Sequence, residues 1–298
     1  DLDAKLANHN LSPQEMGKGR NVWYCMGYIL SIGEAEAVAL HDCDIVTYSR
    51  DLLARLIYPV ANPKFNFDFC KGYYPRVSQN KVKGRVARLL VTPLLRALEK
   101  TIGFNEFISF VDSFRYPLAG EFSFRRRVLK DIRIPYDWGL EIGVLSEMYR
   151  NYAGNRLCQV DISDNYDHKH QDIFFNDNSK GLSKMSIDII KVIIRKLASQ
   201  GETFSMSIFR SLKATYYREA LDFVQIYKKD AIMNAFDIDV HEEETAVELF
   251  AKNIMVAGQV FLDSPMESPN IPAWSRIDTA IPGFLKELKE AVEKDNKF

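Results

Sequence analysis

The stretch AVALHDCD, residues 37–44, places two carboxylates one residue apart at the end of a compact apolar run. The run AVALH, residues 37–41, predicts a short buried strand of the kind found in parallel sheets. Its carboxyl end would place Asp42 and Asp44 at the mouth of the sheet, where α/β proteins bind ligands. Two carboxylates there can hold a hard divalent cation that bridges diphosphate oxygens. Such pairs also occur in ordinary solvated turns, so the tripeptide alone leaves both interpretations open.

Helical and extended patterns alternate on both sides of this strand. Ser49 can cap a helix that we expect to end at Pro59. Phenylalanines at positions 65, 67 and 69 alternate with polar residues, which predicts a strand with one buried face. The expected helices cover residues 19–32, 49–58 and 92–102, and the expected strands cover residues 37–41, 65–74 and 156–162. We therefore expect an α/β domain.

The last third of the chain has helical periodicity. Apolar side chains recur at helical spacing, and the acids that follow Asp239 suit the first turn of a helix. The expected helices cover residues 183–197, 208–223, 241–258 and 283–298. The polar stretch FNDNS, residues 175–179, is the expected boundary. It divides the chain into a catalytic domain, residues 1–175, and a helical C-terminal region, residues 176–298.

Composition excludes several classes of protein. The 298 residues include 39 Lys and Arg against 40 Asp and Glu, so no overall field attracts nucleic acid or anionic lipid. The four cysteines are scattered without a CxxC pair, which argues against a zinc site or a disulfide scaffold. No stretch approaches the roughly 20 apolar residues of a spanning helix, and the N-terminus lacks the apolar region of a signal peptide. We expect a cytoplasmic protein with no membrane partner.

Two basic stretches could bind phosphate. Lys18 stands between two glycines just before a predicted helix, where the backbone can approach a phosphate and the lysine can neutralise it. The basic turn KVKGR, residues 81–85, suits a phosphorylated or carboxylated acceptor. A solvated surface explains the turn equally well. The spacing of a Walker loop is absent.

Histidines and glutamates supply the remaining candidates. His168 and His170 follow a predicted strand, and an imidazole can complete a metal site that carboxylates begin. Histidines in a polar loop are more often simply exposed to solvent. The strings PLAGE, residues 117–121, and WGLEIG, residues 138–143, each combine glycine with glutamate. Backbone and carboxylate could both reach sugar hydroxyls there, although buried acids near helix starts are often structural caps.

Taken in chain order, these strings resemble the motif series of the glucosyl-3-phosphoglycerate synthases and their mannosyl-using relatives. The series is GKG (17–19), DCD (42–44), GRV (84–86), LAGEF (118–122), WGLEIG (138–143) and QVDI (159–162) followed by HKHQ (168–171). The resemblance implies a Rossmann-like GT-A core that transfers glucose or mannose from a nucleoside diphosphate sugar to D-3-phosphoglycerate, with retention at the anomeric carbon. The first strand and helix units of that core have no counterpart here.

The resemblance also implies roles for particular residues. A divalent metal, Mg²⁺ or Mn²⁺, would bind Asp42, Asp44 and His168. The donor would contact Lys18, Asp42, Leu118, Ala119 and Gly120. The acceptor would contact Gly84, Arg85, Val86, Ala87 and His170. The catalytic pair would be Asp44 and Glu141, with Glu141 orienting the reactants rather than forming a covalent bond.

Two of these positions depart from the family pattern. Ala87 replaces a residue with a hydroxyl group, and His170 replaces an asparagine. Both concern the acceptor, so glycerate or another small acid is an alternative to 3-phosphoglycerate. A second alternative is a catalytically silent binding module whose C-terminal helices form a dimer. The resemblance itself implies a homodimer.

Overall fold

The computed structural model describes residues 2–13, 15–167, 181–265 and 270–296. Four strands form its central sheet in the order β1-β5-β2-β6. Their bounds are β1 (Ala37–Leu40), β2 (Phe69–Tyr73), β5 (Phe122–Arg125) and β6 (Leu157–Asp161). β5 is antiparallel to both β1 and β2, whereas β2 and β6 are parallel. The expected α/β class is therefore confirmed, with a mixed sheet.

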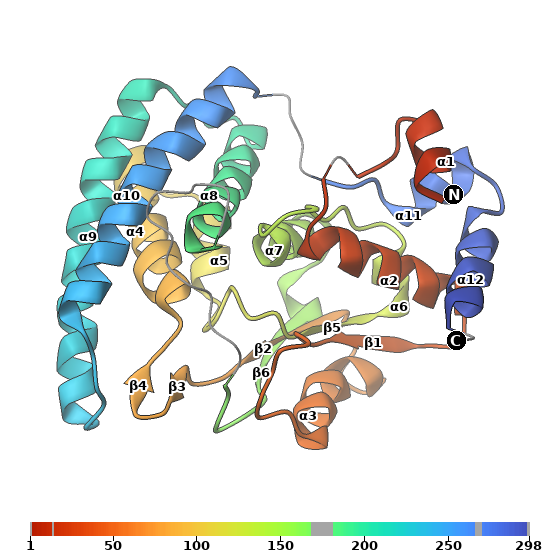
Figure 1. Cartoon of the computed structure of the whole chain (residues 1–298), viewed down its shortest axis with the longest axis horizontal. Helices are drawn as coiled ribbons and strands as arrows, with labels where there is room; N and C mark the ends of the chain where they lie inside the picture. The colour runs from red at the N-terminus through yellow and green to blue at the C-terminus, as the bar shows by residue number, and fades with distance from the viewer. Residues whose placement is uncertain (1, 14, 168–180, 266–269, 297–298) are drawn as a thin grey trace.

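Helices cover both faces of this sheet. Figure 1 shows α3 (Arg50–Ala61) alone on one face, and α2 (Lys18–Ile32), α6 (Arg126–Leu129) and α7 (Leu140–Asn151) on the other. A small core that includes Leu52, Leu56 and Ile162 lies under α3. The other face belongs to a much larger core. The smaller elements are α1 (Leu2–Asn8), β3 (Val77–Ser78), β4 (Lys81–Val82), α5 (Glu106–Asp112), η2 (Gly154–Arg156), α11 (Trp274–Ala280) and α12 (Phe284–Asp295).

The strand β1 ends one residue before the predicted residue 41 and has a different environment. Its four residues are half-buried rather than buried. It lies at one end of the described sheet and pairs antiparallel with β5, so the expectation of a buried parallel strand was wrong. Its partner β5, with the sequence FSFR, was not predicted; apolar and polar residues alternate in it, but both faces of the strand are buried.

Two other sequence expectations also need correction. β2 begins only at Phe69 and is buried on both faces, because α3 covers one face and the large core the other. Phe65 is exposed and stacks on Phe67 before the strand begins, so the alternating phenylalanines do not mark one buried face. The helix α3 continues through Pro59 to Ala61, since a proline near a helix end removes only one hydrogen bond.

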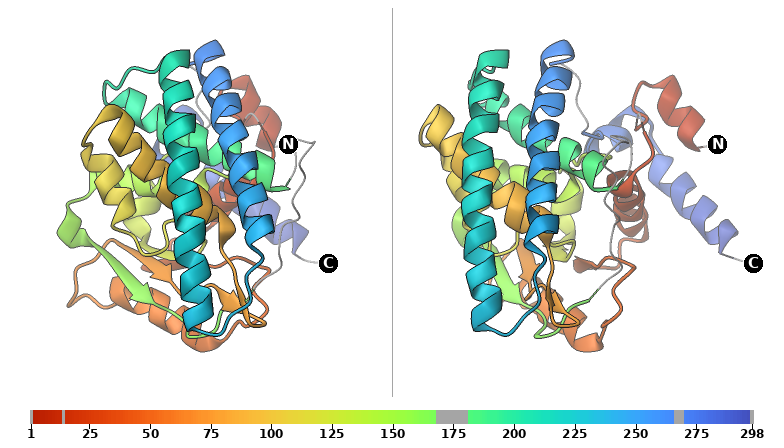
Figure 2. Two further views of the ribbon diagram at one scale, coloured as in Figure 1. Left: turned by 90° about the vertical axis from the view of Figure 1, so that its left-hand side faces the viewer. Right: turned by 60° about the vertical axis from the view of Figure 1, so that its left-hand side comes forward.

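The C-terminal region is helical, as predicted. Earlier in the chain, a π-helix, η1 (Val86–Val91), runs directly into α4 (Thr92–Ile102), and the C-terminal helices pack against both. Three longer helices, α8 (Gly181–Ser199), α9 (Met206–Met233) and α10 (Val240–Asp263), pack beside α4 and η1. Figure 2 shows α9 and α10 side by side over most of their length. One hydrophobic core runs from the sheet into these helices. The predicted boundary at residues 175–179 lies outside the described residues, so the division into two domains stays a prediction.

One described helix, α10, is long and apolar enough to cross a membrane by length and composition alone. Its most apolar window has a mean hydropathy of 1.2, which differs from our expectation that no stretch would qualify. About half of that window, 56%, is buried inside the fold, where α10 packs against α8 and α9. Core helices have the same properties, so we interpret α10 as a core helix.

The helix α2, which begins at Lys18, is fixed by a pair of tryptophans. The rings of Trp23 and Trp274 stack with their centroids 4.1 Å apart. The Trp23 indole N–H donates to the carbonyl of Pro272 at 2.9 Å, and that of Trp274 donates to the carbonyl of Trp23 at 3.0 Å. A Cβ atom on Gly27 would lie 2.1 Å from the Trp274 ring, so only glycine permits this approach. The start of α2 is thus held in place.

A buried aspartate ties three strands together. The Asp68 carboxylate accepts hydrogen bonds from Arg127 and Arg156, each at 2.8 Å. Its backbone also bonds to Arg125, at the end of β5, and to Arg156, just before β6. Asp68 is 2% exposed and immediately precedes Phe69, the first residue of β2. This one side chain therefore compensates two arginines where β2, β5 and β6 meet.

We predict that Asp68→Ala lowers the free energy of unfolding by about 2 kcal/mol, because it leaves two arginines without their shared partner. The loss stays below that of a fully buried pair, since Arg127 is 62% exposed and can be hydrated. Urea denaturation measures it. Asp164→Ala, at an exposed acid, should change stability by less than about 0.5 kcal/mol. Equal effects of the two substitutions would contradict this account.

Candidate active site

A cavity of about 600 Å³ opens beyond the end of β1, between the sheet and the start of α8. It brings together most of the residues that the sequence singled out, from segments far apart in the chain. Those on its wall are Lys18, Asp42, Asp44, Gly84, Arg85, Val86, Ala87, Leu118, Gly120 and Glu141. Ala119 is fully buried behind the wall. His168 and His170 lie outside the described residues.

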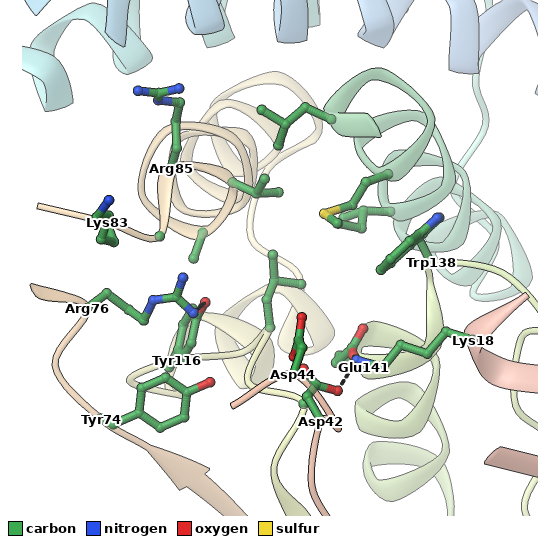
Figure 3. A pocket seen from close by; sticks show the side chains of 18 of the residues that line it. Lys18, Asp42, Asp44, Tyr74, Arg76, Lys83, Arg85, Tyr116, Trp138 and Glu141 are labelled. Carbon is green, nitrogen blue, oxygen red and sulfur yellow. Dashed lines mark hydrogen bonds and ion pairs between the residues drawn. The ribbon is translucent and has the colours of Figure 1, made fainter. Parts of the chain in front are cut away.

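At one end of the cavity, Lys18 joins two carboxylates. Its Nζ lies 2.7 Å from Asp42 Oδ1 and 2.8 Å from Glu141 Oε1 (Figure 3). Burial by itself would lower the pKa of Lys18, but the charges of Glu141 and Asp42 raise it above its ordinary value. Lys18 therefore remains a cation, and it connects the start of α2 with the end of β1 and the first turn of α7.

A buried layer supports the Asp42 segment from below. Glu121 Oε1 accepts the backbone N–H of Asp42 at 3.4 Å and the hydroxyl of Tyr166 at 2.7 Å. Glu121 Oε2 accepts the hydroxyl of Tyr74 at 2.7 Å. The rings of Tyr74 and Tyr166 stack with their centroids 3.6 Å apart. Burial raises the pKa of Glu121, and the charge of Asp42 adds to this shift. The sequence singled out Glu121 in the PLAGE string as a carboxylate that could reach sugar hydroxyls, but it is fully buried and is not on the cavity wall.

The loop Leu118–Gly120 forms the floor beside Asp42. A Cβ atom on Gly120 would lie 2.4 Å from Asp42 Oδ2, so the aspartate fills the space that a side chain would occupy. The buried Lys71 donates to the carbonyl of Ala119 at 2.6 Å and thereby anchors the loop from inside. Burial lowers the pKa of Lys71 to about 8. Lys71 is a supporting residue that the sequence analysis did not identify.

Asp42 and Asp44 fit one part of a metal site. Both carboxylates line the cavity, and carboxylate oxygens are preferred ligands of Mg²⁺ and Mn²⁺. Lys18 already approaches one oxygen of Asp42, which shows that a cation is accommodated there. Within the described ranges, no three His, Cys, Asp or Glu side chains form a group that could hold a metal. The predicted third ligand, His168, is not among the described residues.

The other end of the cavity contains the GRV string. Gly84 has a φ of +75° and precedes the first turn of η1. The Arg85 side chain turns toward α10, where it pairs with Glu242 at 3.0 Å and Glu243 at 3.1 Å. Figure 3 accordingly shows the Arg85 guanidinium pointing away from Asp42 and Asp44. Its positive charge is therefore partly compensated by two acids.

Several residues of the wall were missed by sequence reasoning. In addition to Trp138 of the WGLEIG string, the cavity is lined by Tyr74, Arg76, Tyr116, Leu182, Met185 and Ile189. The last three show that α8 covers the site, although the helical pattern alone could not place that helix over the sheet. A second cavity of about 300 Å³ adjoins the first behind the β3–β4 hairpin and shares Arg76, Lys83 and Gly84 with it.

Behind Trp138, a buried acid pair positions the start of α7. Asp137 Oδ1 accepts the N–H of Gly139 at 2.9 Å, one turn from Glu141. Asp188 of α8 forms ion pairs with Lys184 and Lys191, whose Nζ atoms each lie 3.2 Å from one of its carboxylate oxygens. Burial and the charge of Asp188 raise the pKa of Asp137 to about 6. The WGLEIG string and α8 are thus coupled electrostatically.

Two curated proteins similar to this chain share one activity in their names. No protein-family model matches it. Glucosyl-3-phosphoglycerate synthase of Persephonella marina is 47% identical over 280 residues, which are 94% of this chain and 69% of the relative. The synthase of Methanococcoides burtonii is 40% identical over 284 residues, with the same shares. A crystal structure of the Mycobacterium tuberculosis synthase in complex with Mn²⁺, UDP-glucose and phosphoglyceric acid is 22% identical, has a TM-score of 0.47, and overlaps 65% of this chain and 58% of its own.

Asp137 predicts a pH dependence of stability. Its pKa is about 6 in the folded state and about 3.9 when unfolded, so between these values the folded state holds the additional proton. This contribution is complete below about pH 4 and is lost as the pH rises through 6. Asp137→Asn cannot ionise and removes the effect. Between pH 4 and pH 7 we expect wild type to lose about 2 kcal/mol more unfolding free energy than the variant.

Denaturant unfolding of both proteins across this range measures the difference. Asp131→Asn is the matched control, because Asp131 is an exposed acid near the same loop. Its stability curve should run parallel to that of wild type. A parallel curve for Asp137→Asn as well would show that this carboxyl group has an ordinary pKa.

Proposed function

The chain belongs to the glucosyl-3-phosphoglycerate synthase family, and we propose that it transfers glucose from UDP-glucose to 3-phosphoglycerate with the help of a divalent metal. The family relationship covers nearly the whole chain. The observation that supports the proposal most strongly is the single cavity in which the GKG, DCD, GRV, LAGEF and WGLEIG strings meet. The proposal includes a GT-A type of core for the sheet and the helices that flank it.

The donor belongs at the carboxylate end of this cavity. Asp42 and Asp44, together with His168, would hold Mg²⁺ or Mn²⁺, which when bound neutralises the diphosphate of the leaving group. Lys18 is placed to donate to the same phosphates or to the sugar, because its ammonium group lies between Asp42 and Glu141. The floor Leu118–Gly120 offers backbone groups to the sugar ring. Gly120 lets the Asp42 carboxylate lie directly against this floor.

The acceptor belongs at the Gly84 end. Its hydroxyl oxygen would form the new bond to the anomeric carbon on the same face from which the bond to the UDP phosphate oxygen breaks. The hydroxyl proton then passes to that phosphate oxygen, so no protein nucleophile is needed. Glu141 would orient the reactants, because Lys18 fixes its carboxylate at the wall of the cavity. Gly84, Arg85, Val86 and Ala87 would surround the acceptor phosphate.

Glycerate is the second candidate acceptor. Arg85 is compensated by Glu242 and Glu243, and Ala87 offers no hydroxyl group to a phosphate. Both features reduce the number of groups that a phosphate would find at this end. Parallel assays with 3-phosphoglycerate and D-glycerate separate the two acceptors.

We predict that the purified protein forms glucosyl-3-phosphoglycerate and UDP when Mn²⁺ or Mg²⁺ is present. Asp44→Ala should lower kcat by at least about 1,000-fold, because the transition state then loses a metal ligand. Chelation should abolish turnover, and added metal should restore it. Asp51→Ala, at an exposed acid of α3, is the control and should retain full activity.

Undiminished turnover in Asp44→Ala would remove the metal assignment. If wild type transfers sugar to neither acceptor and does not bind UDP-glucose in the presence of metal, the protein is a catalytically silent binding module rather than a glycosyltransferase.

Lys18→Met provides an independent test of the donor end. We expect KM for UDP-glucose to rise by at least about 10-fold, since a charged hydrogen bond to the donor is lost. KM for the acceptor should change by less than about 3-fold, because Lys18 lies at the opposite end of the cavity. Initial-rate kinetics with each substrate varied in turn measure both values. Lys64→Met, at an exposed lysine beyond α3, should match wild type. A larger effect on the acceptor than on the donor would reverse the assignment of the two ends.

A further inference from the structure

Among the residues that the structure describes, four cations line the main cavity, and they differ in their partners. Lys18 pairs with Asp42 and Glu141, and Arg85 pairs with Glu242 and Glu243. Lys83 and Arg76 belong to the β3–β4 hairpin segment. Within the described part of the chain, Arg76 forms no ion pair, and its guanidinium donates a hydrogen bond to the hydroxyl of Tyr116 at 3.2 Å. Arg76 thus brings an uncompensated charge to the cavity.

Aromatic rings hold this guanidinium in place. Its central carbon lies 6.0 Å from the ring centroid of Tyr74, 5.7 Å from that of Tyr116 and 5.9 Å from that of Tyr166. Tyr74 and Tyr166 are fixed in turn by Glu121. Figure 3 shows Arg76 pointing toward the interior of the cavity above the Tyr74 and Tyr116 rings. A planar guanidinium fixed in this way is organised for a bidentate contact with an oxyanion.

The backbone places Arg76 beside Gly84. A Cβ atom on Gly84 would lie 3.1 Å from Arg76 Cγ and 3.2 Å from its Cβ, so the arginine stem packs directly on this glycine. The Lys83 N–H donates to the carbonyl of Arg76 at 2.7 Å, which closes the hairpin around the pair. The Arg76 side chain therefore lies directly beside the backbone of Gly84.

We propose that Arg76 determines acceptor specificity by binding the phosphate group of the acceptor at the Gly84 end of the cavity. The inference rests on the proposed function, because it takes 3-phosphoglycerate as the acceptor. The phosphate would bind the Arg76 guanidinium, which the surrounding tyrosine rings already hold in place. Arg85, compensated by two acids, then mainly connects η1 with α10. The reacting hydroxyl of the acceptor lies two carbons from its phosphate and can extend toward the Asp44 end.

The test compares Arg76→Gln with Arg76→Lys and wild type. For Arg76→Gln we expect kcat/KM for 3-phosphoglycerate to fall by at least about 30-fold, with KM for UDP-glucose changed by less than about 3-fold. Arg76→Lys should recover only part of the loss, because an ammonium group cannot make the bidentate contact. Arg115→Gln is the matched control. Arg115 is exposed, packs on Tyr73, and lines only the second cavity.

Binding measurements separate this inference from the proposed function. Calorimetry without donor should show that Arg76→Gln weakens 3-phosphoglycerate and glycerol 3-phosphate by similar factors and leaves D-glycerate unchanged. This result would support the phosphate contact even if wild type transferred no sugar. Equal weakening of D-glycerate, or unchanged affinity for all three, would overturn it.

Inorganic phosphate distinguishes the two cavities that share Arg76. We expect it to inhibit transfer competitively with 3-phosphoglycerate, and to do so more weakly in Arg76→Gln. Noncompetitive inhibition that disappears in Arg76→Gln would place the anion in the second cavity and contradict the acceptor role.

Discussion

The ammonium group of Lys18 lies between two carboxylates that the fold brings together from different elements at one end of the cavity, and the geometry of the donor end depends on this contact. Asp42 follows β1 and Glu141 belongs to the first turn of α7, so without a cation between them the two negative charges would repel each other. The position of Lys18 is set by α2, whose tryptophan pair fixes the whole helix. The packing of a remote segment therefore decides the charge arrangement in the cavity.

A second layer, below the cavity, gives the site its rigidity. Glu121 and Lys71 are both buried, and each is satisfied by hydrogen bonds rather than by a direct ion pair among the described residues. Glu121 holds the Asp42 backbone and two stacked tyrosines, and Lys71 holds the Ala119 carbonyl. Because the same tyrosine rings also pack against the Arg76 guanidinium, one buried layer supports both the donor end and the acceptor end of the cavity. Groups of this kind do not touch the reactants but fix the groups that do.

Much of the site could be predicted from the sequence because its residues belong to short strings with local signals. A carboxylate pair after an apolar run or a lysine between glycines is visible without a structure. The supporting roles were not predictable, since Tyr166 and Arg76 acquire them from contacts across the sheet and the hairpin, and Glu121 was noticed only as a possible sugar contact. The same limit explains the errors in the fold. The FSFR sequence of β5 alternates but both faces of the strand are buried, and the environment of β1 depends on its antiparallel pairing with β5. Helical periodicity found α8 to α10 but could not place α8 over the cavity.

The central claim is that the cavity beyond β1 holds a metal-bound nucleoside diphosphate at Asp42 and Asp44. The most direct measurement is a crystal structure with Mn²⁺ and UDP, in which anomalous scattering locates the metal. The account predicts a single strong manganese peak between the Asp42 and Asp44 carboxylates, with the UDP phosphates beside Lys18. A manganese peak at other residues, or UDP bound outside this cavity, would contradict it.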